Sequence, residues 1–373
     1  MSEAVVNAAD YQFDLPEELI AQQPPEASGG RRDDARLAVV HRDGRGLEER
    51  TFRDLGDYLG DADVLVLNNA RVVPTLLRGQ DEDGRAVAVS VHSPTDDGTW
   101  HCLVAAATVC RSGALLSLGP EGEIGGRLLY EIQPGSWRIA LDAPDAETVY
   151  RAADPIYPGY LKQAPADPEY YQTAYASRPG AVLFPSAGRH FTPAMFDEFK
   201  ARGMAIVEVT LFIAARSHYW VRTAFKQMVD AGVLGDAEAD AALVDAAPTP
   251  VIDFPRPERY EITAAAADTI NERRQKGGRL FVVGTSALRT LETVADDTGL
   301  FWPQTGFTQL TIAPGHRFRA CDAFVTNLHR PGSSELVLTS AFAGRERLLD
   351  VYRTRIVPDR YRFYEFGDSM LIL

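Results

Sequence analysis

The sequence has few of the residues that would indicate a disulfide-linked, metal-binding or membrane-spanning protein. It contains three cysteines and seven histidines among 373 residues, and neither type has the paired spacing of a disulfide framework or a zinc site. No apolar run approaches the length that spans a bilayer, and residues 1–10 lack the basic and apolar segments of a secretory signal. We therefore predict a cytoplasmic protein with no bound metal and no membrane contact.

Basic residues are outnumbered by acidic ones. The sequence has 38 lysines and arginines against 52 aspartates and glutamates, which gives a formal net charge of −14. A large nucleic-acid footprint usually requires a basic face, so the charge argues against extensive contact with a polyanion but not against a local one. The sequence also lacks the Gly-x-Gly-x-x-Gly pattern of dinucleotide-binding and methyltransferase-like loops.

Two kinds of pattern divide the chain. Residues 75–150 contain short strand-like runs that Gly, Pro and Asp turns separate, so this part is expected to be all-β. From residue 155 onward, strand and helix patterns alternate, as in α/β proteins. The five clearest all-β runs are residues 86–92, 100–106, 114–118, 126–132 and 136–141.

The most informative segment is FPSAGRHFT at residues 184–192. An apolar run, residues 181–184, predicts a buried strand before it. Thr192 and Pro193 then predict a helix start, with Thr as N-cap and Pro at the first helical position. A second strand is expected at residues 205–212. Ser186 and His190 therefore fall on a loop from strand to helix, where α/β proteins commonly bind ligands.

Several other motifs occur with this one in the order found in a single enzyme family. They are residues 14–23, 33–37, 64–74, 171–176, 283–292, 340–344, 361–363 and 367–371. On these motifs the chain resembles the S-adenosylmethionine:tRNA ribosyltransferase-isomerases, which make epoxyqueuosine in tRNA. The resemblance extends from about residue 13 to the C-terminus.

The resemblance implies both a fold and a reaction. The fold would be a discontinuous, barrel-like α/β domain, residues 1–74 and 151–373, into which a small β-barrel domain, residues 75–150, is inserted. The reaction would transfer the ribosyl moiety of S-adenosylmethionine to a 7-aminomethyl-7-deazaguanine in tRNA and isomerise it, releasing adenine and methionine. S-adenosylmethionine would be a co-substrate, and no metal would take part.

Polar side chains that follow strands are the candidates for this chemistry. His190 and His329 both follow expected strands, and imidazole titrates near working pH, so we expect them to act as catalytic acids or bases. The alternative for each is a structural role, in which hydrogen bonds hold a loop. Residues 284–286 end a strand and begin a helix, which is a natural site for an anion.

The same loops supply the expected S-adenosylmethionine site. Arg71 suits bidentate binding of a carboxylate, or else a salt bridge at the domain junction. Arg289 lies one helical turn beyond residue 285 and should face the same opening. Thr192 either contacts the ligand or orders its loop. The expected contacts are Asn69, Arg71, Ser186, Thr192, Thr285, Ser286, Arg289, Asp322 and Asn327.

Two departures from the family pattern leave the acceptor open. Asn69 replaces the family's aspartate, and residues 212–220 replace a glycine-rich turn with a bulkier one. Arg216, His218 and Trp220 in that segment are expected on the acceptor side, where they would narrow the entrance. The alternatives to a tRNA acceptor are a paralogue that uses a small-molecule acceptor and a non-catalytic relative that binds a nucleoside or RNA. The sequence does not indicate an oligomeric state.

Overall fold

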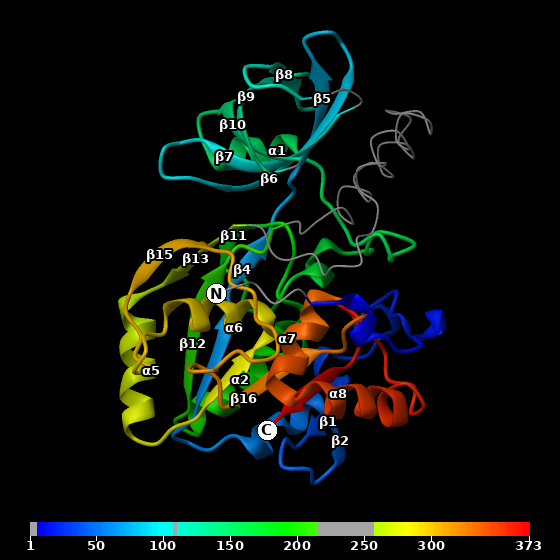
Figure 1. Ribbon diagram of the computed structural model, residues 1–373, viewed down its shortest axis with the longest axis vertical. Helices are drawn as coiled ribbons and strands as arrows, with labels where there is room; N and C mark the ends of the chain where they lie inside the picture. The colour runs from blue at the N-terminus through cyan, green and yellow to red at the C-terminus, as the bar shows by residue number, and fades with distance from the viewer. Residues whose placement is uncertain (1–5, 107–109, 134, 215–256) are drawn as a thin grey trace.

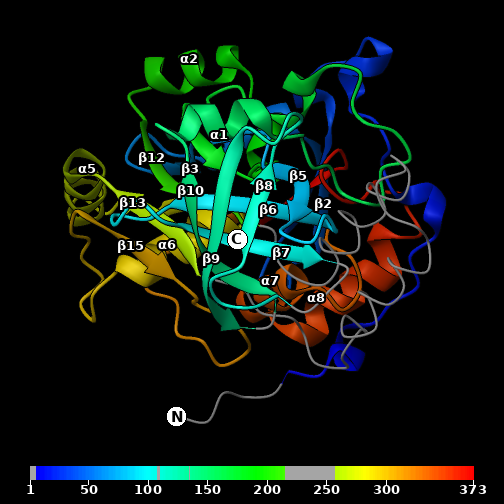
Figure 2. The same cartoon turned by 90° about the horizontal axis from the view of Figure 1, so that it is seen from above.

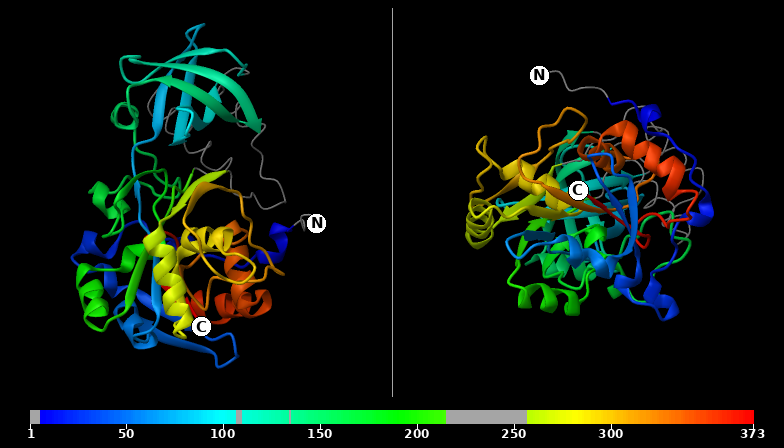
Figure 3. Two further views of the ribbon diagram at one scale, coloured as in Figure 1. Left: turned by 90° about the vertical axis from the view of Figure 1, so that its left-hand side faces the viewer. Right: turned by 90° about the horizontal axis from the view of Figure 1, so that it is seen from below.

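The computed structural model describes residues 6–106, 110–133, 135–214 and 257–373. A closed β-barrel lies at one end and a nine-stranded sheet with helices on both faces forms the rest (Figure 1). The expected mixed α/β fold with an inserted all-β barrel is confirmed. The side view shows the elongated shape that this arrangement gives (Figure 3).

The barrel has six antiparallel strands in the order β10-β7-β6-β5-β8-β9. Alternate side chains of each strand point inward, and Val87, Val89, Trp100 and Trp137 pack in its core. Helix α1 (Ala146–Ala152) follows the last strand. The strands are β5 (Leu76–Asp81), β6 (Ala86–Pro94), β7 (Trp100–Ala106), β8 (Leu115–Leu118), β9 (Ile124–Gln133) and β10 (Ser136–Asp142).

The large sheet has the order β15-β13-β12-β3-β14-β16-β17-β1-β2. Neighbours among β12, β3, β14 and β16 are parallel, so these strands end at one edge of the sheet. The strands are β1 (Arg36–Val40), β2 (Leu47–Thr51), β3 (Val64–Asn68), β12 (Ala205–Leu211), β13 (Glu258–Ile262), β14 (Leu280–Val283), β15 (Gln304–Thr308), β16 (Ala323–Asn327) and β17 (Ser369–Ile372).

Both faces of this sheet are buried, which explains why its central strands are continuously apolar. On β3, Val64 and Val66 pack in one core while Leu65 and Leu67 pack in the other. The helices on the two faces can be followed from above (Figure 2). They are α2 (Pro193–Ala201), α5 (Ala264–Gln275), α6 (Gly284–Val294), α7 (Ser334–Ala343) and α8 (Arg345–Val351).

Short helical turns complete the described structure. All are 3-10 turns except the last, which is a π-helical turn. They are η1 (Ala8–Tyr11), η2 (Glu17–Leu19), η3 (Pro25–Ser28), η4 (Arg32–Asp34), η5 (Phe52–Tyr58), η6 (Pro168–Tyr171), η7 (Ser186–His190) and η9 (Tyr352–Ile356). Within the described residues, no helix combines the length and apolar character needed to cross a bilayer.

The segment before Ser186 differs from its prediction. The strand expected at residues 181–184 is instead β11 (Arg178–Ala181), which pairs with β4 (Ala70–Val72) in a separate two-stranded sheet. The backbone N–H groups of the next two residues both donate to the carbonyl of Ile213, at 2.9 and 3.2 Å, so the chain leaves the ladder there. The expected helix start is confirmed, because Thr192 caps α2.

Candidate active site at the carboxyl edge of the sheet

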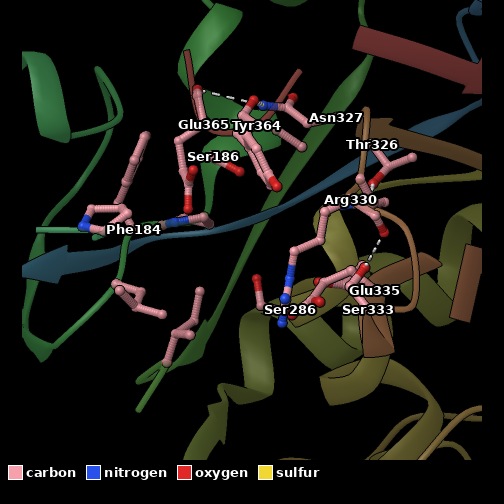
Figure 4. Close-up of a pocket in the computed structure, with 18 of the residues that line it drawn as sticks. Phe184, Ser186, Ser286, Thr326, Asn327, Arg330, Ser333, Glu335, Tyr364 and Glu365 are labelled. Atoms are coloured by element: carbon pink, nitrogen blue, oxygen red, sulfur yellow. Dashed lines mark hydrogen bonds between the residues drawn. The ribbon is translucent and has the colours of Figure 1, made fainter. Parts of the chain in front are cut away.

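A pocket opens where β14 and β16 end, and it encloses about 310 Å³. Cavities of roughly 300–1,000 Å³ are typical of small-ligand sites. Figure 4 shows polar side chains from several loops around it. The lining segments are residues 158 and 160, 183–187, 213, 284–286, 326–327, 329–330, 332–335 and 364–365.

The amino end of α6 forms one wall of the pocket. Gly284 begins this helix with φ of +83°, a conformation that favours glycine. Among the described residues no side chain caps the helix, so its first N–H groups remain available beside Thr285 and Ser286. The Ser286 hydroxyl is held by the amide of Asn68, 3.0 Å away. Such a helix terminus attracts a carboxylate or phosphate.

Asn327, the last residue of β16, connects the pocket to His190. Its Oδ1 lies 3.0 Å from Nε2 of His190, and its Nδ2 donates to the carbonyl of Tyr364 at 3.0 Å. His190 is buried against Phe52 and does not line the pocket. Burial and the nearby Arg189 guanidinium lower the pKa of His190 to about 4. The imidazole is therefore neutral near pH 7, and it positions Asn327.

The turn after Phe363 brings a carboxyl group to the pocket wall. Tyr364 has φ of +70°, a strained conformation for a tyrosine. The turn holds it there, since its N–H donates to Leu328 and its carbonyl accepts from both Asn327 and Gly367. The next residue, Glu365, lines the pocket. Sequence reasoning missed Glu365, although it lies in a short gap, residues 364–366, between two family motifs.

Tyr160 lies on the same wall and contacts this turn. Its hydroxyl donates to Oε2 of Glu365, and its ring stacks on Tyr364 with centroids 4.5 Å apart. Desolvation by the pocket wall raises the pKa of Glu365 to about 7. A carboxyl group with that pKa can exchange protons near neutral pH. Tyr160 belongs to no motif, so no pattern in the sequence indicates its role.

The segment between β16 and α7 supplies the remaining polar groups. His329 lines the pocket, with Nε2 2.8 Å from the Thr326 hydroxyl. Arg330 and Glu335 extend toward the part of the cavity beside Ser286 (Figure 4). The Arg330 guanidinium and the N–H groups at the start of α6 therefore suit an anion. The carboxylates of Glu335 and Glu365 suit a cation.

Of the predicted site residues, five line this one pocket: Ser186, Thr285, Ser286, Asn327 and His329. Arg71 does not line it and forms an exposed ion pair with Glu169. Thr192 also lies outside, where its hydroxyl accepts from the N–H of Met195 as the cap of α2. For both residues, the structural alternative fits the observed contacts.

Arg289 and Asp322 are not where they were expected. Arg289 does not face the pocket opening, because its buried guanidinium pairs with Glu258 and donates to the carbonyl of Leu310 at 2.9 Å. Asp322 precedes β16 and therefore lies at the opposite edge of the sheet, where it accepts from the N–H of Leu280 at 2.8 Å. Arg289 was misplaced because its position one helical turn after Thr285 does not determine where its side chain points, and Asp322 because it precedes its strand instead of following it.

Asn69 is a buried structural residue outside the pocket. Its Nδ2 donates to Glu208 at 2.9 Å and its Oδ1 accepts from the Thr210 hydroxyl at 2.7 Å. An aspartate would lose the donor and repel Glu208.

We therefore expect Asn69→Asp to destabilise the fold by about 1 kcal/mol, with no gain in activity. Since the added repulsion requires both carboxylates to be ionised, the loss should be greater at pH 8 than at pH 4. Urea unfolding at both pH values measures it. A more stable, more active variant would contradict this assignment.

Arg216, His218 and Trp220 lie outside the described residues. In the described part of the chain, no group of three or more His, Cys, Asp or Glu side chains is placed to hold a metal ion.

The chain matches known proteins over nearly its full length. A model of the queuosine biosynthesis protein family matches residues 8–228 and 253–372. The chain belongs to this family. It is 38% identical to the S-adenosylmethionine:tRNA ribosyltransferase-isomerase of Moorella thermoacetica over 98% of its own length and 99% of that protein. The corresponding protein of Symbiobacterium thermophilum is 37% identical, over 98% of this chain and 99% of its own length.

A solved structure agrees with these relatives. The crystal structure of S-adenosylmethionine tRNA ribosyltransferase from Thermotoga maritima is 28% identical in sequence. It has a TM-score of 0.53, and the match covers 98% of this chain and 100% of that one. The similarity therefore includes both the barrel and the α/β part, and the family suggested by the sequence motifs is confirmed.

Proposed function

We propose that this protein is an S-adenosylmethionine:tRNA ribosyltransferase-isomerase. It would transfer the ribosyl moiety of S-adenosylmethionine to a 7-aminomethyl-7-deazaguanine in tRNA and isomerise it, with release of adenine and methionine. The observation that carries this proposal is similarity over essentially the full length to relatives of that name. Neither the small-molecule acceptor nor the non-catalytic alternative is favoured by any feature of the described residues. A cytoplasmic location would suit a tRNA substrate.

The pocket chemistry supports S-adenosylmethionine as the co-substrate. This molecule carries a carboxylate, an ammonium group, a sulfonium and an adenine. The amino end of α6 and the Arg330 guanidinium suit the carboxylate. The carboxyl groups of Glu335 and Glu365 suit the two cations, and the rings of Phe184 and Tyr364 suit a purine.

The two histidines would then have different roles. We assign His190 to positioning, since it acts through Asn327 and stays neutral near pH 7. His329 lines the pocket and remains our candidate for hydrogen bonding or proton transfer to the substrate. Ser186, Thr285, Ser286 and Asn327 are proposed contacts of S-adenosylmethionine, and no metal is assigned a role.

Chromatographic detection of adenine tests this function. We expect adenine release from S-adenosylmethionine only when tRNA carries the 7-aminomethyl-7-deazaguanine base. The matched control is the same transcript with an ordinary guanine. Release with the free deazaguanine base but not with tRNA would support the small-molecule alternative. Ligand binding without any release would support the non-catalytic one.

A further inference from the structure

A reaction that isomerises a ribosyl unit requires a group that removes a proton from carbon. In S-adenosylmethionine, the positive sulfur makes the adjoining carbon–hydrogen bonds more acidic. A base for this step must line the pocket, be unprotonated at working pH and have a pKa near that pH. The candidates are the titratable side chains of the pocket and of its immediate surroundings.

The histidines meet these requirements poorly. His190 is separated from the cavity by Asn327, and its pKa is lowered to about 4. His329 lines the cavity, but its Nε2 lies within hydrogen-bond distance of the Thr326 hydroxyl. Among the described residues that line the pocket, two carboxyl groups remain, Glu335 and Glu365.

Glu365 is the more rigidly held of these carboxyls. It follows Tyr364, whose strained backbone is fixed by Leu328, Asn327 and Gly367. A Cβ at Gly367 would lie 2.4 Å from the carbonyl of Arg362, so the turn also depends on a glycine there. Glu335 instead occupies the first turn of α7, where acidic residues are common because they interact with the helix dipole.

The groups that face the Glu365 carboxyl come from three other segments. Desolvation has the largest effect and raises its pKa. The Tyr160 hydroxyl donates to the carboxylate and lowers the pKa, Glu335 on α7 raises it, and Arg330 after β16 lowers it. The result is a pKa of about 7, which suits a base that must be half ionised at neutral pH.

We propose that Glu365 is the base of this site. Its carboxylate removes the proton from the ribose carbon that is bonded to the sulfonium. The electron pair of the carbon–hydrogen bond stays on carbon, where the positive sulfur stabilises it. Glu365 becomes a neutral carboxylic acid and holds the proton that adenine needs when it leaves. This proposal rests on the function proposed above and adds a catalytic residue to it.

The first test is the pH dependence of adenine release. The kcat/KM of the wild type should fall below pH 7, because the base becomes protonated. This fall is the acidic limb of the pH profile. Glu365→Gln should lower kcat by about 10²–10⁴-fold and abolish that acidic limb. Tyr160→Phe should move the limb to higher pH, because the carboxylate loses a donor that lowers its pKa. Glu346→Gln, which changes an exposed residue of α8, should alter neither kcat nor the pH of the acidic limb.

The second test needs only binding. A sulfonium beside Glu365 favours the ionised carboxylate, so S-adenosylmethionine should release protons when it binds at pH 6.5. Calorimetry in buffers of different ionisation enthalpy measures this release, which Glu365→Gln should abolish with affinity changed only a few-fold.

Three results would overturn the assignment. They are a Glu365→Gln enzyme that keeps its activity and acidic limb, loss of the limb in Glu335→Gln instead, and equal proton release by wild type and Glu365→Gln. In each case adenine release by the wild type would still support the proposed function. A wild type that neither binds S-adenosylmethionine nor releases adenine would contradict the function itself.

Discussion

Asn327→Ala should lower kcat/KM for adenine release by about 10²-fold or more, because small displacements of catalytic groups have effects of that size. The Asn327 amide is 2% exposed and links two parts of the site. Its oxygen is paired with His190, and its nitrogen holds the Tyr364 carbonyl. Alanine removes both contacts and frees the turn that carries Glu365. Calorimetry and single-turnover kinetics with S-adenosylmethionine and tRNA measure the effect.

Asn271→Ala is the matched control for this variant. Asn271, on α5, also donates an amide hydrogen bond to a backbone carbonyl, that of Phe301 at 2.8 Å, but it lies outside the pocket. It should lose a similar part of the folding stability while its kcat/KM stays near the wild-type value. If both variants lost kcat/KM equally, the effect of Asn327 would be one of stability.

Glu258→Gln should destabilise the fold by about 3–5 kcal/mol, the range found when a buried ion pair is broken on one side. Glu258 is 1% exposed and Arg289 is 2% exposed, so water solvates neither charge. The carboxylate also accepts from the N–H of Ala214 at 3.0 Å. The pair joins β13 to α6, whose amino end forms a pocket wall.

Glu261→Gln provides a control on the same strand. Glu261 pairs with Arg178 at 2.7 Å, but that arginine side chain is 44% exposed. Exposed pairs contribute about 0–1 kcal/mol, so this variant should unfold at nearly the wild-type urea concentration. A similarly small loss for Glu258→Gln would show that the buried pair is not a major contributor to stability.

Local patterns predicted the barrel and the helix starts well. The strand expected at residues 100–106 is β7, Trp100–Ala106, because alternating apolar residues and flanking turns mark both ends. Thr192 and Pro193 gave the start of α2 for the same kind of local reason. The strand expected at residues 181–184 was displaced because a contact with Ile213, distant in sequence, decides where β11 ends.

The candidate site was predicted only in part. Thr285 and Asn327 were predicted near the pocket that they line because one follows β14 and the other ends β16, positions that the sequence pattern reveals. Arg289 was misplaced because its partner, Glu258, lies on a different element and no local pattern connects them. Glu365 was missed because its proximity to Tyr160 depends on a contact between residues 205 positions apart.

The position of β17 in the sheet has a consequence for synthesis on the ribosome. The last strand, Ser369–Ile372, lies between β16 and β1, with Leu37 and Phe324 among its register partners. The hairpin of β1 and β2, made first, therefore has no place in the sheet until β17 has been synthesised. The nascent α/β part must wait with an open sheet edge, a state that favours aggregation. The barrel, whose six strands are complete by Asp142, can close long before then.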